Sequence, residues 1–142
     1  MLMRADYPAT YVADVRAQVA ANVATFDALG LTPEQRAAFE PGYVQQLLLA
    51  LDSYFTHRGR ALEGKDGNPL NEVRMITDSI QGNDGRGPIV PVLAPNSTIK
   101  YRPERSVLGL EIGDPLDLGI AAYQKLALAF LDEVEARFPS GS

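Results

Sequence analysis

The chain of 142 residues contains no cysteine and a single histidine, His57. Without cysteine it has no disulfide, no thiolate ligand for a metal and no cysteine nucleophile. Zinc hydrolases and helical di-iron proteins use two or more histidines, so one histidine is too few for either centre. The segment Asp66-Gly67-Asn68 also lacks the ligand spacing of a calcium-binding EF-hand loop. We therefore expect no metal and no cofactor.

Positive charge and long apolar runs are also scarce. The formal net charge is −5, whereas proteins that bind nucleic acid usually carry a basic face. The most apolar segment, residues 44–55, is too short to span a bilayer and is interrupted by Gln45, Gln46 and Asp52. The N-terminal residues lack the basic and apolar run of a signal peptide. The sequence thus predicts a cytoplasmic protein that binds neither nucleic acid nor membrane.

Apolar residues recur at steps of three and four along most of the chain, which is typical of amphipathic helices. This pattern predicts helices over about residues 8–29, 33–62, 69–81 and 120–138. Thr32-Pro33 and Asn68-Pro69 are start signals, because the first residue of each pair can cap a helix and proline suits the first helical position. Pro41-Gly42 predicts a break in the second helix at 41–42. A chain of this length is expected to form a single domain, residues 1–142.

The pattern changes before the last helix. Short segments rich in β-branched residues and bounded by proline, asparagine and glycine predict strands at about residues 89–93, 98–102, 106–110 and 115–118. So small a sheet is not stable alone and must pack on the helices or on a partner chain. We predict a mostly α fold, in which a four-helix bundle-like core carries a small antiparallel β-meander or hairpin inserted before the last helix.

The densest polar segment runs from His57 to Arg74, and we call it the polar turn. It holds the only histidine, three arginines, a lysine, three acidic residues and two asparagines between two apolar helical patterns. At about 100° per residue, Arg58 lies roughly 20° from the line of Leu51 on the buried face of its helix. A buried guanidinium needs a carboxylate partner. The polar turn is therefore the first place to look for a site.

Two interpretations of the polar turn remain open. If the flanking helices pair antiparallel around residues 64–68, Glu72 comes level with Arg58 and is its expected partner, with Glu63 or Asp66 second. Such a pair would stabilise the helical hairpin without any further role.

In the other interpretation the polar turn binds a small anionic ligand. Arg58, Asn71 and Arg74 are then the ligand-binding residues, because guanidinium and amide groups donate hydrogen bonds to anions. His57 and Glu72 are candidate catalytic residues, because imidazole and carboxylate groups transfer protons near neutral pH. No substrate or reaction follows from these residues, so whether the protein is an enzyme stays open.

Leu49, Met75 and Leu128 are apolar residues that the helical pattern places on the outer faces of three different helices. Either the meander covers them or they form the seam of a homodimer, and we predict a homodimer. The leading functional hypothesis is a homo-oligomeric binding or interaction module. The alternative is a small enzyme or anionic-ligand-binding protein that uses the polar turn.

Two parts of the chain resemble segments found in small uncharacterised bacterial proteins. One is residues 51–55 (L-D-S-Y-F) followed by residues 63–74 (E-G-K-D-G-N-P-L-N-E-V-R), and the other is residues 99–101 (I-K-Y) followed by 106–108 (S-V-L). The resemblance extends over the whole chain and implies only that the polar turn is a family feature. The predicted bundle also resembles helical ribonuclease domains of the HEPN type. Their motif requires an arginine shortly before the histidine. In this chain the corresponding residues before His57 are 51–53 (L-D-S), so the motif is missing.

Overall fold

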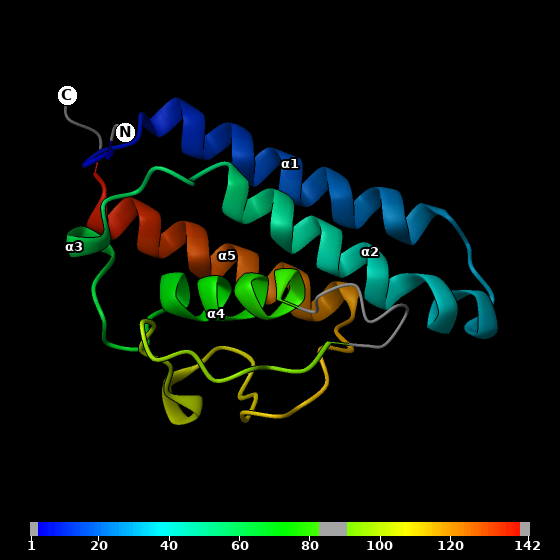
Figure 1. Ribbon diagram of the computed structural model, residues 1–142. Helices are drawn as coiled ribbons and strands as arrows, with labels where there is room; N and C mark the ends of the chain where they lie inside the picture. Colours follow the sequence, from blue (N-terminus) through cyan, green and yellow to red (C-terminus); the bar gives the residue numbers. More distant parts are fainter. Residues whose placement is uncertain (1–2, 83–90, 140–142) are drawn as a thin grey trace.

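The computed structural model describes residues 3–82 and 91–139 (Figure 1). These residues form five α-helices and one short 3-10 helix. The α-helices are α1 (Ala9–Ala28), α2 (Pro33–Ser53), α3 (Arg60–Glu63), α4 (Pro69–Gln81) and α5 (Ile120–Arg137), and the 3-10 helix is Pro103–Arg105. The predicted mostly helical class is therefore confirmed.

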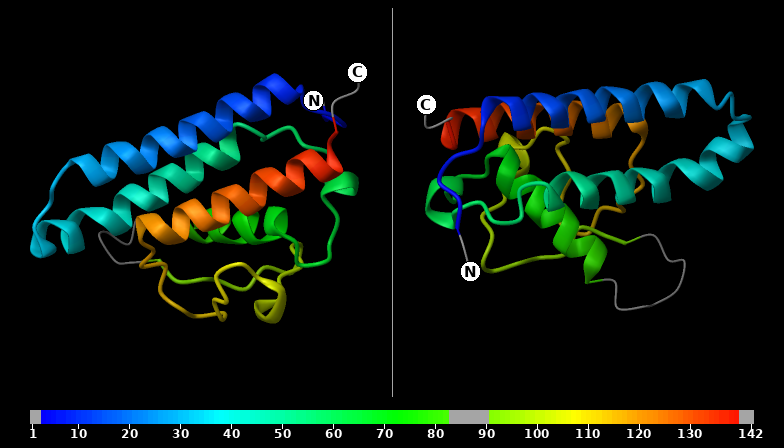
Figure 2. Two further views of the ribbon diagram at one scale, coloured as in Figure 1. Left: turned by 180° about the vertical axis from the view of Figure 1, so that it is seen from behind. Right: turned by 90° about the horizontal axis from the view of Figure 1, so that it is seen from above.

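Helix α5 is the centre of the fold. It lies against α1, α2 and α4, and α4 also packs on α2 (Figures 1 and 2). The two ends of the described chain come together beside α3, where the Tyr7 amide donates to the Phe138 carbonyl oxygen at 3.2 Å. This end of the bundle also holds the polar turn.

Each long helix buries one face, at the spacing of three and four that its sequence predicts. The buried residues are Val12, Val15, Val19 and Phe26 in α1, Val44, Leu47, Leu48 and Leu51 in α2, and Tyr123, Leu126, Phe130 and Val134 in α5. Full burial of such a side chain stabilises the folded state by about 1.5–3 kcal/mol. The continuous apolar core therefore holds the helices together.

Helix α2 begins at the residue that the sequence indicates, but it continues without the predicted break. The Gln35 amide donates to Thr32 Oγ1 and the Thr32 amide donates to Gln35 Oε1, which completes a capping box. The predicted break at 41–42 is wrong, because Pro41 lies inside the helix. Tyr43 stacks on Phe39 just before Pro41 and on Phe26 of α1. This packing on both sides offsets the hydrogen bond that proline removes.

The prediction that the second helix extends to residue 62 is also wrong, since α2 ends at Ser53. The Ser53 hydroxyl donates to the Ala50 carbonyl oxygen at 2.7 Å, and the Thr56 hydroxyl donates to the Ser53 carbonyl oxygen at 2.7 Å. The Thr56 hydroxyl takes up a carbonyl group that a continuing helix would bond to the amide of residue 57, whereas the Ala50 carbonyl oxygen still accepts the helical hydrogen bond from the Tyr54 amide. The chain then turns and resumes as the single turn of α3.

The predicted β-meander is wrong for the part of it that the structure describes. Residues 91–118 contain no strand, only an isolated bridge between Val92 and Pro115, while 89–90 lie outside the described residues. Three backbone hydrogen bonds join 91–93 to 113–116, but they do not extend into a ladder. Prolines 91, 95, 103 and 115 lack the amide that a ladder needs.

Side chains of α4 take up several amides of this segment instead. The Ala94 amide donates to Ser79 Oγ at 3.0 Å, and the Val107 and Leu108 amides donate to the Glu72 carboxylate. The segment therefore covers α4 as an irregular layer (Figure 2).

No helix within residues 3–82 and 91–139 is long and apolar enough to cross a bilayer.

Candidate functional site

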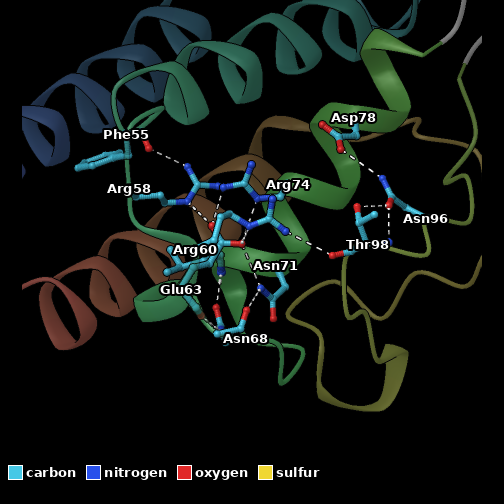
Figure 3. A network of polar contacts seen from close by, with 12 residues as sticks. Phe55, Arg58, Arg60, Glu63, Asn68, Asn71, Arg74, Asp78, Asn96 and Thr98 are labelled. Atoms are coloured by element: carbon cyan, nitrogen blue, oxygen red, sulfur yellow. Dashed lines mark hydrogen bonds and ion pairs between the residues drawn. The ribbon is translucent and has the colours of Figure 1, made fainter. Parts of the chain in front are cut away.

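The polar turn is organised around the buried carboxylate of Glu63 (Figure 3). Its Oε1 accepts from Arg58 Nε at 2.6 Å and from an Arg74 terminal nitrogen at 2.7 Å. Its Oε2 accepts from Arg74 Nε at 3.0 Å and from Asn71 Nδ2 at 3.2 Å. We call Arg58, Glu63, Asn71 and Arg74 the buried arginine cluster. It joins α3 to α4 through the side chain of a four-residue helix.

Each of the three guanidinium nitrogens of Arg58 donates a hydrogen bond to another group of the protein. Besides Glu63, it donates to the Phe55 carbonyl oxygen at 3.0 Å and to Asp52 Oδ1 at 2.9 Å. The guanidinium carbon lies 5.4 Å from the ring centroid of Phe130 on α5, a cation–π contact. Only 2% of Arg58 is exposed. Its donors are therefore directed at groups of the protein itself and not at solvent.

The charge of Glu63 is stabilised by its neighbours. Burial alone would raise the pKa of Glu63, but the hydrogen bond from Arg74 and the charges of Arg58 and Arg74 outweigh burial and hold the pKa below its usual range. The same contact with Glu63 outweighs burial at Arg74 and raises the pKa of its guanidinium. The cluster is thus a charged network with its hydrogen bonds satisfied.

Two asparagines build the turn between α3 and α4. Asn68 caps α4, because its Oδ1 accepts from the Leu70 amide at 2.8 Å while its Nδ2 donates to the Glu63 carbonyl oxygen at 2.8 Å. The Oδ1 of Asn71 accepts from the Asp66 and Gly67 amides at 3.2 and 3.0 Å. Asn71, predicted to bind a ligand, is buried and bonded to its own turn.

The predicted pair between Arg58 and Glu72 is wrong, and the second choice, Glu63, is the partner. Asn71 and Arg74 are three residues apart and share one face of α4, whereas Glu72 points about 100° away. The fully buried Glu72 carboxylate accepts from the Val107 and Leu108 amides at 2.7 and 3.1 Å. Burial raises the pKa of Glu72 above its usual value, although those two amides act in the opposite direction.

His57, the other candidate catalytic residue, is not brought together with Glu72, Asn71 or Arg74. Its exposed side chain lines a hollow of about 410 Å³ on another side of the α2–α3 connection. We call this space the tyrosine hollow. It is lined by Arg4, Tyr7, Pro8, Tyr11, Ser53, Tyr54, Thr56 and His57.

The N-terminal segment closes one side of the tyrosine hollow. The Arg4 amide donates to the His57 carbonyl oxygen at 2.6 Å, and the Gly59 amide donates to the Arg4 carbonyl oxygen at 2.9 Å. A side chain at Gly59 would place its Cβ 3.2 Å from that carbonyl oxygen, which explains glycine there. These two bonds bring Arg4 and His57 to the same hollow although they are far apart in the sequence.

Tyrosine rings form the rest of this hollow. The guanidinium carbon of Arg4 lies 5.0 Å from the Tyr7 ring centroid, and the Tyr7 and Tyr11 rings stack at 6.1 Å. The Tyr11 hydroxyl donates to the Tyr54 carbonyl oxygen at 2.6 Å. The Tyr7 hydroxyl is buried and has no hydrogen-bond partner among the described residues, and burial raises its pKa. The hollow thus combines a cationic rim with aromatic walls.

Sequence reasoning missed Arg4, Tyr7, Tyr11 and Tyr54. Tyr7 precedes α1, which begins at Ala9, and Tyr11 lies in its first turn. Nothing local joins that pair to Tyr54 and His57, because the joining contacts are tertiary. The hollow could therefore be found only after the helices had been placed.

The proposed dimer seam changes as well. Met75 is buried rather than on the surface, and it borders a small hollow together with Ala94 and Pro95 of the irregular layer. Leu49 is half-buried and Leu128 is exposed. One of the three residues is therefore covered by the segment before the last helix, so the three do not make a common surface. The homodimer stays a prediction.

In the part of the chain that the structure describes, no three histidine or acidic side chains lie close enough together to hold a metal ion. No family model, curated protein or solved structure matches this chain. Function is therefore inferred from the geometry of the two polar regions alone.

Replacing Glu63 with glutamine should lower the free energy of unfolding by about 3 kcal/mol, because Arg58 and Arg74 would lose their shared buried counter-charge. Urea denaturation at pH 7 measures the change. Glu104→Gln, an exposed site in the 3-10 helix, is the matched control and should change stability by less than about 0.5 kcal/mol. A loss as small as that of the control would show that the cluster does not stabilise the fold.

The contribution of Glu63 to the free energy of unfolding should decrease as the pH falls. The pKa of Glu63 is lowered from an ordinary value of 4.5, so its stabilisation is complete above that pH and disappears as the pH falls through the lowered folded value. The stability difference between wild type and Glu63→Gln should therefore shrink from pH 6 to pH 3. Taking the difference cancels the opposite effect of Glu72, which both proteins share. A difference that stays constant over this range would contradict the assignment.

Replacing Glu72 with alanine should release the irregular layer, because the Val107 and Leu108 amides lose their only acceptor in the described structure. A hydrogen bond to a charged group contributes about 1.5–3 kcal/mol, so the exchange of these two amides should accelerate by roughly tenfold or more. Hydrogen exchange measured by NMR tests this. The Leu93 amide, which donates to the Asp114 carbonyl oxygen, is the internal control. Equal acceleration at all three amides would indicate global destabilisation instead.

Proposed function

We propose that this protein binds a small organic anion in the tyrosine hollow. The observation that supports the proposal is the convergence of the Arg4 and His57 side chains on one hollow with tyrosine walls. Its volume of about 410 Å³ falls in the range of roughly 300–1,000 Å³ that is typical of small-molecule sites.

The groups around the hollow suit an anion with a planar body. A guanidinium donates paired, charge-assisted hydrogen bonds to carboxylate or phosphate oxygens. The imidazole of His57 provides a second donor, and it makes no hydrogen bond to another described side chain. The exposed rings of Tyr11 and Tyr54 offer surfaces on which a planar or apolar group can stack. Together they define a ligand with one negative end.

The buried arginine cluster is the weaker candidate for such a site. Arg58 and Asn71 are buried, and their donors already meet carboxylate and carbonyl oxygens of the chain. A ligand would have to displace Glu63 to reach them. The anion-binding role that the sequence suggests for Arg58, Asn71 and Arg74 is therefore moved to the His57 end of the polar turn. Homo-oligomerisation is a separate prediction and is compatible with this role.

The proposal predicts that 3-phenylpropionate binds the protein and that the uncharged 3-phenylpropanol binds at least about tenfold more weakly. One charge-assisted hydrogen bond contributes about 1.5–3 kcal/mol, and about 1.4 kcal/mol corresponds to a tenfold change in affinity. Titration followed by NMR measures both dissociation constants and shows whether the shifted amides surround the hollow.

Arg4→Gln should remove the preference for the acid, while Lys100→Gln, which removes the same charge from an exposed site outside the hollow, should keep it. Equal binding of acid and alcohol to the wild type, or shifts confined to another surface, would refute the proposed function.

A further inference from the structure

The tyrosine hollow continues beyond its tyrosine wall. A second hollow of about 220 Å³ is lined by Tyr11, Asp14, Val15, Gln18 and Tyr54. Tyr11 and Tyr54 border both hollows. They are 36% and 40% exposed, and the Tyr11 hydroxyl donates to the Tyr54 carbonyl oxygen. The two hollows thus share these two tyrosines at the junction of α1 and the end of α2. We call the two hollows and the tyrosines between them the groove.

The two ends of this groove carry opposite charges. Arg4 and His57 border the first hollow, and Asp14 is the acidic residue of the second. Among the described residues, no ion pair or hydrogen bond engages the exposed Asp14 carboxylate. It is available to a ligand cation. The Arg4 guanidinium donates through Nε to the Asp6 carbonyl oxygen at 3.1 Å and lies 3.9 Å from the Asp6 carboxylate in an exposed pair. Its terminal nitrogens make no hydrogen bond to another described residue, so they can donate to a ligand anion.

The length of the groove follows from the helix that forms it. The Tyr7 and Tyr11 rings are 6.1 Å apart, and Asp14 follows Tyr11 by three residues, about 4.5 Å along a helix axis. The Arg4 guanidinium carbon lies 5.0 Å from the Tyr7 ring centroid, so the distance from Arg4 to Asp14 is on the order of 10–15 Å. An extended peptide advances about 3.3 Å per residue, so roughly three to four residues span this distance.

Building on the proposed function, we propose that the ligand is a short zwitterionic peptide of about three residues. Its terminal carboxylate binds Arg4 and His57, its terminal ammonium binds Asp14, and its central side chain packs on Tyr11 and Tyr54. Tyrosine rings bury apolar surface at low entropic cost, which suits a peptide with a central apolar residue.

Polar side chains beside the groove suit the backbone of such a peptide. Gln18 donates its amide hydrogen to Asn22 Oδ1 and keeps its carbonyl oxygen as an acceptor. The hydroxyl of Ser53 donates to its own helix and can still accept a hydrogen bond from a peptide amide. A ligand with two anionic ends would instead meet the carboxylate of Asp14, which disfavours it.

The test uses the tripeptide L-alanyl-L-phenylalanyl-L-alanine, its N-acetyl form and its C-terminal amide, each titrated by NMR into the full chain. The wild type should bind the free tripeptide at least fivefold more tightly than either blocked form. In Asp14→Asn the preference over the N-acetyl form should disappear, while the affinity for the N-acetyl form stays unchanged. In Arg4→Gln the preference over the amide should disappear. Glu104→Gln and Lys100→Gln are the matched charge controls and should bind as the wild type does.

The outcomes separate this inference from the proposed function. If 3-phenylpropionate binds in an Arg4-dependent manner but acetylation of the tripeptide has no effect, the proposed function stands and the zwitterionic peptide is refuted. If neither compound binds, both are refuted. If sedimentation shows a dimer that Tyr54→Ser dissociates and that the tripeptide does not, a second copy of the chain occupies the groove and the inference is overturned.

Discussion

The buried carboxylate of Glu63, held between Arg58 and Arg74, is the interaction on which the arrangement of this end of the bundle depends. It connects α3 to α4, and Arg58 extends the connection to the end of α2 and to Phe130 of α5. A charge removed from water costs several kcal/mol unless counter-charges and hydrogen bonds surround it. Here both are present, so the contacts of Glu63 stabilise the observed path of the backbone between α2 and α4.

The tyrosine hollow lies next to that path. Arg58 is buried, whereas His57 just before it is exposed and borders the tyrosine hollow. The backbone bridge between Arg4 and Arg58 then brings the N-terminal segment to the same place. The charged residues that are most conspicuous in the sequence are used to build the turn. Of the residues that border the two hollows, only His57 belongs to the polar turn, whereas Arg4, Asp14 and the tyrosines lie outside it.

The errors of the sequence-based predictions have physical causes. Glu72 was expected beside Arg58 because the second helix was extended to residue 62, whereas α2 ends at Ser53 and the chain that follows places Glu63 of α3 against Arg58. The β-branched segments between residues 91 and 118 have the composition of strands, but only three backbone hydrogen bonds join 91–93 to 113–116, and other amides donate to the side chains of Glu72 and Ser79. Which acceptor a guanidinium or an amide finds depends on which helices and loops pack against each other in the folded chain.

The sequence by itself determined the mostly helical class, the apolar faces of the long helices, the capping box at Thr32 and the need of Arg58 for a buried acid. These features depend on periodicity and on local hydrogen bonds, which act over a few residues. Only the tertiary structure decided which acid pairs with Arg58, how residues 91–118 are held, and that the hollow beside Arg4 and the hollow beside Asp14 share Tyr11 and Tyr54. Those outcomes depend on contacts between residues far apart in the chain, where packing and burial choose among partners that the local sequence leaves equivalent.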